Sequence, residues 1–407
     1  MTNLLLGFVA LLAGLTAAFW TAASLRLFTY RRRFISLSDI PPDEPPGGWP
    51  WVSLVVPARN EEHTLVPAVQ SLLRLDYPAL QVVAVDDRSE DNTGRLLDEA
   101  AQADPRLRVV HVTSLPEGWL GKNHAMAEGA RQAAGSWLLF TDADVHFAPD
   151  ALKRAMAFAL RHGLGHAVAL PHFVAPGFLE RCFVSAFGLF ATLKFRPWDL
   201  NRAGTRAYIG VGAFNLVRRE DYERVGGHRP LRMEVLDDVK LGLVLRRSGV
   251  PQGACGSGGL VRVRWQHGLR ASIAGLVKNM FAGPEWSVGF ALVAAGAVAF
   301  VSAGPALCAL THPWPWVRAL GILGTVGPML LHGAVARRAA DGTGLEGLTF
   351  PFGGLLLSGI VLYSTVAAVL RGGIFWRGTF YSLPELRRGY VRRSDWPQER
   401  AVGWPSA

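Results

Sequence analysis

The middle of the chain alternates between short apolar runs and longer stretches with helical spacing. Four short apolar runs predict buried strands at residues 51–58, 80–87, 107–112 and 136–142, and the first of them is rich in β-branched residues. Apolar residues spaced three and four apart predict helices at 61–75, 92–103 and 122–134. Strands that alternate with helices of about 10–15 residues indicate βαβ units. The pattern therefore predicts an α/β domain with a mostly parallel sheet flanked by helices.

Four much longer apolar stretches lie outside this region, at residues 4–24, 288–311, 316–336 and 349–370. A helix that crosses a bilayer needs about 20 predominantly apolar residues, and each stretch reaches that length. The start of the chain, MTNLLL, lacks the basic residues that open a signal peptide, so an uncleaved anchor is favoured over a cleaved leader. The pattern predicts an integral membrane protein.

The formal net charge of +10 comes with arginines concentrated beside the apolar stretches. This distribution fits the positive-inside rule and attraction to anionic lipid headgroups. Nucleic-acid binding would require basic and aromatic residues interleaved along one soluble face. The sequence lacks that pattern, so no nucleic-acid partner is expected. The three widely spaced cysteines fit neither a disulfide framework nor a zinc site.

Basic clusters also predict the orientation in the membrane. The arginines at 31–33 place the central domain in the cytoplasm, at an inner or plasma membrane of bacterial type. The basic tail from residue 371 onward is expected on the same side. Two cytoplasmic parts require an even number of crossings between them, so one of the three C-terminal stretches is expected to be re-entrant or interfacial. Arg337 and Arg338 favour a true hairpin for the first two, and the pattern leaves the choice open.

Polar side chains cluster where the predicted strands end, which is where ligands bind in parallel sheets. The clusters contain Arg59, Asn60, Glu61 and Glu62 after the first strand, Asp86 and Asp87 after the second, and Asp142 and Asp144 after the fourth. The carboxyl ends of neighbouring parallel strands meet at one edge, so we expect these side chains to converge on a ligand site.

Asp142 and Asp144, in the segment TDADV, allow two interpretations. One is a turn that caps the following helix. The other is a metal site, because two carboxylates one residue apart suit a hard divalent cation such as Mg²⁺ or Mn²⁺. The segment DDRSEDNT is likewise typical of a surface turn when taken alone.

Asp237 and Asp238 lie at the predicted start of another helix, and Arg246 and Arg247 lie at its end. Complementarity with the helix dipole accounts for this arrangement without any chemistry. A carboxylate at a helix start beside a cleft is nevertheless a candidate general base.

Lys122 precedes a predicted helix in the segment GWLGKNHA. A lysine and backbone N–H groups at such a position can bind a phosphate, and the alternative is a solvated lysine in an ordinary loop. Neither GxGxxG nor GxxxxGK[ST] occurs after the first strand, which argues against a dinucleotide site and a Walker-type phosphate loop.

Five segments taken together extend this interpretation: VSLVVPARNEEHTL, VVAVDDRSEDNT, GKNHA, LLFTDADV and LDDVKLGLVLRRSG. In this order and spacing, over about residues 51–265, they resemble the family 2 glycosyltransferases of the GT-A fold. The resemblance implies an inverting transfer of a sugar from a nucleotide-diphosphate-sugar donor, with a divalent metal, Mg²⁺ or Mn²⁺, as cofactor.

The resemblance also implies roles for individual residues. Asp238 would be the general base, and Asp237 stands beside it where the family usually has Glu. Asp142 and Asp144 match the metal-binding DxD element. The residues implied in nucleotide-sugar binding are Pro57, Arg59, Asn60, Glu61, Asp87, Lys122, Asp142, Arg264 and Trp265.

One motif departs from the processive members of the family. Processive synthases carry Gln-x-x-Arg-Trp, whereas here Arg264 and Trp265 are kept and Val261 replaces the glutamine. This departure favours a single transfer. Trp265 could instead be an interfacial anchor, because 269–283 has the pattern of an amphipathic helix lying on the membrane.

The membrane layout is similar to that of enzymes that glycosylate lipids, such as ceramide glucosyltransferases and bacterial enzymes of hopanoid and carotenoid pathways. GWLGKNHA and FWRGTFY (375–381) are most similar to the terpenoid-associated group. The resemblance thus implies a membrane lipid or terpenoid acceptor, which 177–195 would admit unless that stretch is a core helix. The alternatives are a processive polysaccharide synthase and a polyprenyl-phosphate sugar transferase. A transporter or scaffold would have lost its acidic clusters, and all three are present.

The expected organisation has five parts. They are an N-terminal transmembrane anchor (1–30), a cytoplasmic GT-A catalytic domain (50–265), an interfacial amphipathic helix (266–286), a C-terminal transmembrane block (287–371) and a basic cytoplasmic tail (372–407).

Overall fold

The computed structural model describes residues 2–31, 34–202 and 204–395. Two arginines of the cluster used to predict orientation, Arg32 and Arg33, lie outside the described residues, as does the end of the expected tail, 396–407.

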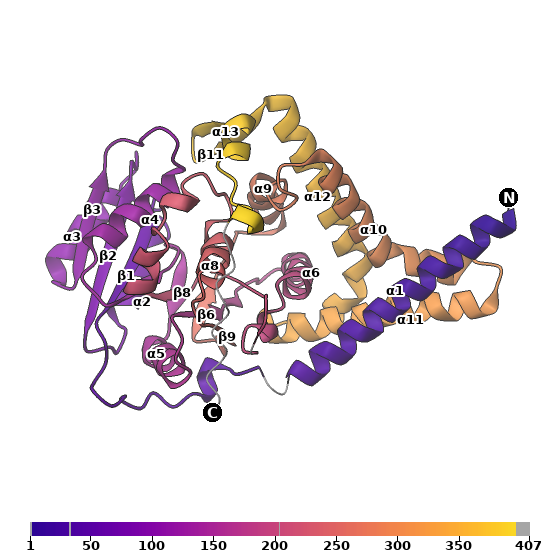
Figure 1. The fold of residues 1–407 in the computed structure, drawn as a ribbon, viewed down its shortest axis with the longest axis horizontal. Helices are drawn as coiled ribbons and strands as arrows, with labels where there is room; N and C mark the ends of the chain where they lie inside the picture. Colours follow the sequence, from indigo (N-terminus) through magenta and orange to yellow (C-terminus); the bar gives the residue numbers. More distant parts are fainter. Residues whose placement is uncertain (1, 32–33, 203, 396–407) are drawn as a thin grey trace.

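A seven-stranded sheet forms the centre of the α/β domain (Figure 1), with the order β3-β2-β1-β4-β8-β6-β9. Its strands are β1 (Val52–Ala58), β2 (Leu80–Asp87), β3 (Leu107–Val112), β4 (Trp137–Phe140), β6 (His166–Leu170), β8 (Asn215–Arg218) and β9 (Gln252–Gly256). The first four are the predicted strands, and they pair in parallel. Only β8 runs antiparallel to both of its neighbours. The mostly parallel α/β fold is confirmed.

Helices cover both faces of this sheet because its strands are apolar on both faces. The helices of the domain are α2 (Leu65–Leu73), α3 (Thr93–Ala103), α4 (Gly121–Gln132), α5 (Ala151–Arg161), α7 (Arg219–Arg224) and α8 (Asp237–Arg247). Helix α4 approaches the sheet closely through Gly129, where an added Cβ would lie 2.4 Å from Val55 Cγ1. The first predicted helix starts later than expected, because residues 62–64 form a turn before α2 begins at Leu65.

Short elements complete the fold. A three-stranded sheet contains β5 (Val145–Phe147), β10 (Val261–Val263) and β7 (His172–Phe173), and a hairpin contains β11 (Gly373–Trp376) and β12 (Thr379–Ser382). The hairpin leads into α13 (Leu383–Arg388). The 3₁₀ turns are η1 (Leu37–Asp39), η2 (Pro197–Asp199), η3 (Arg229–Leu231), η4 (Leu345–Thr349) and η5 (Arg393–Asp395).

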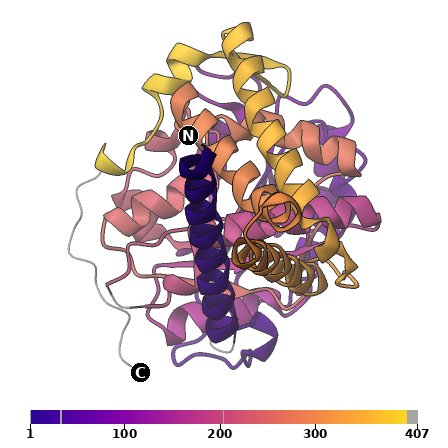
Figure 2. The same cartoon turned by 90° about the vertical axis from the view of Figure 1, so that its right-hand side faces the viewer.

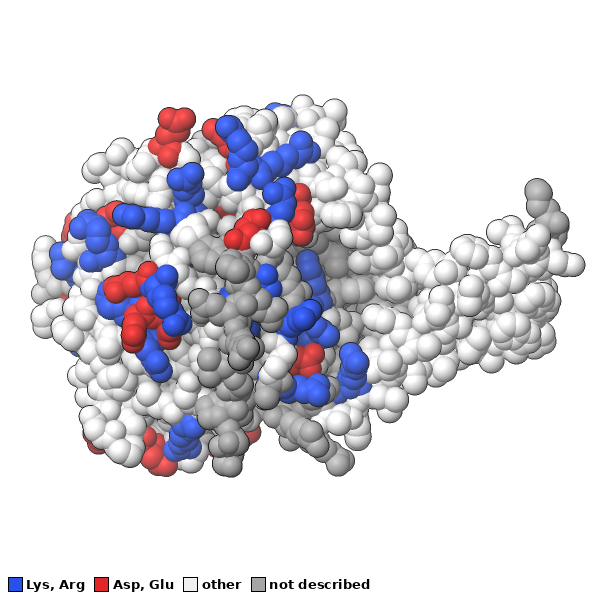
Figure 3. Space-filling model, viewed as in Figure 1, with Lys and Arg blue, Asp and Glu red and all other residues white. Residues whose placement is uncertain are grey.

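Four helices in the described part of the chain are long and apolar enough to cross a membrane. They are α1 (Thr2–Arg31), α10 (Val288–Thr311), α11 (Pro315–Ala339) and α12 (Phe350–Arg371). Figure 1 shows α1, α11 and the end of α10 extending away from the α/β domain as an arm, and Figure 2, turned by 90°, shows this arm from its outer end. The described face of this arm in Figure 3 carries no charged side chains, in contrast to the catalytic domain.

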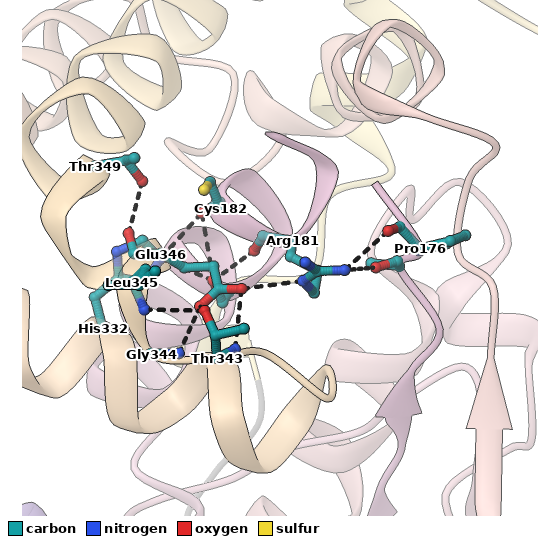
Figure 4. Close-up of polar contacts among 11 residues, drawn as sticks. Pro176, Arg181, Cys182, His332, Thr343, Gly344, Leu345, Glu346 and Thr349 are labelled. Carbon is teal, nitrogen blue, oxygen red and sulfur yellow. Dashed lines mark hydrogen bonds and ion pairs between the residues drawn. The ribbon is translucent and has the colours of Figure 1, made fainter. Parts of the chain in front are cut away.

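Helices α6 (Phe178–Phe195) and α9 (Leu269–Met280) lie between the catalytic domain and the apolar helices. An ion pair fixes α6 to the turn before α12, as Figure 4 shows. The Arg181 Nε lies 3.0 Å from Glu346 Oε1, whose side chain is fully buried. The other oxygen of Glu346 accepts a hydrogen bond from the Gly344 N–H at 2.7 Å. Arg181 also donates to the carbonyl of Pro176, so the α11–α12 connection is bound to the catalytic domain.

Candidate active site

A cavity of about 320 Å³ opens at the carboxyl ends of β1, β2 and β4, the edge at which the sequence predicted a ligand site. Eight residues implied in donor or metal binding line it: Pro57, Arg59, Glu61, Asp87, Lys122, Asp142, Asp144 and Trp265. Of the other implied residues, Asn60, Arg264, Asp237 and Asp238 are not part of the lining.

Asn60 connects two loops at the edge of the cavity. Its backbone is left-handed, with φ of 53°, a conformation that asparagine tolerates better than most residues. Its side-chain oxygen accepts a hydrogen bond from the Glu90 N–H at 2.8 Å, and its own N–H donates to the Ser89 hydroxyl at 3.1 Å. Asn60 therefore shapes the loop that carries Arg59 and Glu61.

Asp87 lies at the end of β2, against the start of α4. Arg88 donates to both of its oxygens, at 2.7 and 3.1 Å. Gly121 is required here, because a Cβ at this position would lie 2.5 Å from Asp87 Oδ2. The absence of that side chain lets the first turn of α4, with Lys122, come close to the end of β2.

Lys122 is the centre of a partly buried charge cluster. Its Nζ lies 2.8 Å from Asp142 Oδ1 and 3.5 Å from Asp237 Oδ2. Burial alone would lower the pKa of Lys122, but Asp142, Asp237 and Asp238 outweigh burial and raise it. In turn Lys122 lowers the pKa of Asp142 against the effect of burial. Lys122 is thus a paired cation within the site, so the solvated-loop alternative is wrong.

Asp238 is fixed by backbone amides at the start of α8. Its Oδ2 accepts a hydrogen bond from the Gly212 N–H at 2.7 Å, and its Oδ1 accepts one from the Val239 N–H at 2.8 Å. Burial raises the pKa of Asp238 above the ordinary aspartate value. Gly212 also touches Asp142, since a Cβ there would lie 2.5 Å from Asp142 Oδ2. Gly212 therefore lies between Asp142, which lines the cavity, and Asp238, which does not.

Asp237 is buried beside Asp238. Burial raises its pKa to about 6, and Asp238 adds to this effect while Lys122 opposes it. Two adjacent carboxylates with raised pKa values beside one lysine form a cluster that can accept a proton near neutral pH.

Asp144 has no ion-pair partner among the described residues. Burial, Asp142 and Glu61 together raise its pKa to about 7. No group of three or more His, Cys, Asp or Glu side chains in the described ranges could bind a metal by itself. Mg²⁺ is commonly bound by one or two carboxylates together with substrate phosphates. Asp142 and Asp144 therefore fit a hard divalent cation whose remaining ligands would include a bound diphosphate.

Trp265 and Arg264 differ in placement. The Trp265 ring lines the cavity and stacks on Phe187 of α6, with ring centroids 5.1 Å apart. It thus contacts both the donor cavity and the apolar helices. Arg264 is exposed and outside the lining.

The cavity also contains residues that the sequence did not indicate. They are Gln266, Lys278 of α9, and Trp376, Arg377 and Tyr381 of the β11–β12 hairpin. The segment FWRGTFY is similar to the terpenoid-associated group and falls within the expected tail, 372–407. Its arginine between aromatic residues was the available signal, but no local pattern connects it to β1.

The sheet and the charged clusters at its carboxyl edge are arranged as in the GT-A fold. Residues 53–226 match the family model described as glycosyl transferase family 2. The structure of a mannosyltransferase from Pyrobaculum calidifontis in complex with GDP-Man and Mn²⁺ superposes with a TM-score of 0.51. It is 22% identical and covers 78% of this chain and 98% of its own, which supports the fold.

Curated relatives include 4,4'-diaponeurosporenoate glycosyltransferases from Staphylococcus aureus. The protein of strain USA300 is 25% identical over 236 residues, which are 57% of this chain and 61% of the relative. The protein of strain bovine RF122 / ET3-1 is 26% identical over 203 residues, or 49% of this chain and 52% of the relative. The chain therefore spans at most 61% of the length of these relatives.

Proposed function

We propose that the protein transfers one sugar from a nucleotide-diphosphate-sugar to a hydroxyl group of a membrane lipid or terpenoid. The observation that carries the proposal is the partly buried charge cluster of Lys122, Asp142, Asp237 and Asp238 at the carboxyl edge of the domain that matches the family 2 model. The relatives named for a carotenoid acid support a terpenoid acceptor. The long apolar helices beside the domain support an acceptor that stays in the bilayer.

Asp238 is the proposed general base. The Gly212 and Val239 amides fix its carboxylate, and its raised pKa favours taking up a proton. The acceptor oxygen forms a bond to the anomeric carbon while its proton moves to Asp238. The bond from that carbon to the diphosphate oxygen breaks, and its electron pair leaves with the nucleoside diphosphate. Configuration at the anomeric carbon is inverted by this single displacement.

Lys122 is positioned to counter the charge of the departing diphosphate. Its ammonium is charged at physiological pH, because Asp142 and Asp237 raise its pKa. A Mg²⁺ or Mn²⁺ ion bound through Asp144 and Asp142 would supply further charge neutralisation to the diphosphate. Trp265 and Phe187 form an aromatic wall between the cavity and α6, on the side from which a lipid acceptor would enter.

We further propose that α1, α10 and α11 cross the membrane and that α12 does not. The turn between α10 and α11 lies next to the start of α1, where His312 Nε2 is 3.3 Å from the Leu6 carbonyl oxygen. Both ends of α12 are instead bound to the catalytic domain. Glu346 before it pairs with Arg181, and Arg377 after it pairs with Glu61 at 2.7 Å. A helix that crosses the membrane has its two ends on opposite sides. Because α10 and α11 cross and α12 does not, the C-terminal part crosses the membrane twice. Two crossings place the central domain and the tail on the same side.

The test of the proposed function is a product assay. Purified full-length protein is incubated with a panel of nucleotide-sugars and membrane lipid extract, and the lipids are analysed by mass spectrometry. We expect one lipid to gain the mass of one sugar residue with wild type and not with Asp238→Asn. A polymer ladder or an acid-labile sugar phosphate lipid would point to a processive synthase or a polyprenyl-phosphate transferase. No product with any donor would refute the proposal.

A further inference from the structure

The hairpin β11–β12 lies far from the catalytic domain in the sequence and yet forms one wall of the donor cavity. The Gly121 N–H at the start of α4 donates to the Tyr381 hydroxyl at 3.2 Å. The Arg377 guanidinium donates to the Arg59 carbonyl and, at 2.7 Å, to Glu61 Oε1. The hairpin therefore contacts the ends of both β1 and α4.

Arg377 is at the tip of this hairpin in an unusual backbone conformation. The two turn residues Arg377 and Gly378 have φ of 46° and 79°, as in a type I′ turn. Such turns favour asparagine and glycine, because a side chain with a positive φ is strained. An arginine here is retained against its backbone preference, and strained residues of this kind cluster at ligand-binding positions.

The cations of the cavity differ in whether a carboxylate already neutralises them. Lys122 is paired with Asp142 and Asp237. Arg377 has one partner, Glu61, and about half of its side chain is exposed. Lys278 has no ion-pair partner in the described part of the chain, and its Nζ lies 4.2 Å from the centre of the Trp376 ring.

Lys278 is a partly buried amine without a paired carboxylate among the described residues. Burial, together with the nearby Lys122 and Arg377, lowers its pKa to about 8 against the opposing effect of Asp237 and Asp142. A ligand anion in the cavity would supply the missing negative charge. The Nε of Arg59 is likewise buried without a hydrogen-bond partner among the described residues. These cations face one cavity, which indicates an anionic ligand with more than one charge.

We propose that Lys278 and Arg377 bind the diphosphate of the donor, so that a hairpin following the apolar helices completes the nucleotide-sugar site. The inference rests on the proposed function and adds to it two binding residues from outside the family 2 domain. Arg264, the arginine retained from the processive motif, lies outside the cavity, and Lys278 and Arg377 supply the positive charge there.

The test measures binding of UDP and GDP to full-length protein in detergent, in the presence of Mg²⁺, by isothermal titration calorimetry. Lys278→Met and Arg377→Gln are each expected to weaken diphosphate binding about tenfold or more, the range for a hydrogen bond between charged groups. Lys278→Arg should retain most of the affinity. Arg371→Gln, an exposed arginine at the end of α12, is the matched control and should bind like wild type.

Binding of the nucleosides uridine and guanosine separates a diphosphate contact from a structural role. The variants should bind nucleosides as wild type does, and an equal loss for nucleoside and diphosphate would overturn the inference.

Vesicles of phosphatidylglycerol and of phosphatidylcholine test the other source of phosphate. Loss of phosphatidylglycerol binding with unchanged diphosphate affinity would assign these cations to lipid headgroups and overturn it too. If wild type forms glycosylated product while the variants retain full diphosphate affinity, only this inference fails. If wild type binds no diphosphate and forms no product, the proposed function fails with it.

Discussion

Asp238 and its two amide donors make the sharpest prediction at the residue scale. Asp238→Asn keeps the shape of the side chain but removes the group that accepts the acceptor proton. Transfer should fall by about 10²–10⁴-fold, the usual contribution of a general base. Nucleotide-sugar affinity should stay within about twofold of wild type, since the donor cavity is lined by other residues. Transfer assays and calorimetry measure the two effects. Asp76→Asn, at an exposed ion pair with Lys153, is the control, and loss of binding would give Asp238 a structural role.

Asp144 makes a second prediction, because within the described residues it lacks the cationic partner that Asp142 has in Lys122. Asp144→Ala should remove metal-stimulated transfer and weaken Mn²⁺ binding by about tenfold or more, as expected when one of two carboxylate ligands is lost. Electron paramagnetic resonance titration of Mn²⁺ measures binding without relying on activity. A variant that keeps full activity in the presence of a chelator would contradict the metal site.

Lys278 predicts how diphosphate binding depends on pH. Its pKa is lowered to about 8, and a bound diphosphate would raise it again. The charged Lys278 ammonium thus contributes fully to diphosphate affinity below about pH 8. This contribution is lost as the pH rises above 8, and the affinity should fall by at most about tenfold per pH unit. Dissociation constants of UDP at pH 7, 8 and 9 measure the effect. In Lys278→Arg the guanidinium stays charged throughout, so the fall should disappear. Parallel curves for the two proteins would exclude Lys278 as the titrating group.

The residues that the sequence identified and those that it missed differ in one physical respect. Lys122, Asp142 and Asp144 directly follow or precede a strand or helix with a clear period, so the parallel sheet brings them to one edge. Lys278 and Arg377 reach the same cavity only through the packing of apolar helices, and packing between distant segments leaves no periodic pattern.

At the scale of elements, the close packing of α4 on the sheet is testable. In Gly129→Ala the new Cβ would lie 2.4 Å from Val55 Cγ1 and 2.9 Å from Val85 Cγ2. Both valines are stiff at χ1, so the helix must shift, and overpacking of this kind costs about 1–3 kcal/mol. The midpoint of thermal unfolding in detergent should fall. Gly296→Ala in α10, where a Cβ meets open space, should leave it unchanged, and an unchanged midpoint for Gly129→Ala would mean that the interface is looser than described.

The predicted elements agree with the structure where the periodic pattern is long. The prediction is less complete where the strands are short. The first four strands and the helices between them are confirmed because each has several turns or residues of regular pattern. Strands such as β5, β7 and β10 have two or three residues, too few to show an alternation. Their positions depend on tertiary pairing, for example of β10 with both β5 and β7.

At the scale of the whole molecule, the proposed membrane arrangement predicts which positions share a side. Single cysteines at Pro313, Asp341 and Phe375 would probe the α10–α11 turn and the two ends of α12. A membrane-impermeant maleimide should label 341 and 375 from the same side and 313 from the opposite side. The native cysteines are buried and give a low background. Labelling of 341 and 375 from opposite sides would show that α12 crosses the bilayer.

Helix α12 has a consequence for what counts as the enzyme. It is continuous with the hairpin that carries Arg377, and its Ser364 hydroxyl accepts a hydrogen bond from the Phe281 N–H, one residue beyond α9 and close to Lys278. A water-soluble fragment that ends near residue 265 would keep every family motif but lose a whole wall of the donor cavity. With Lys278 and Arg377 as donor-binding residues, the smallest catalytic unit extends well past residue 265, and any displacement of α12 would be passed to the nucleotide site through the hairpin.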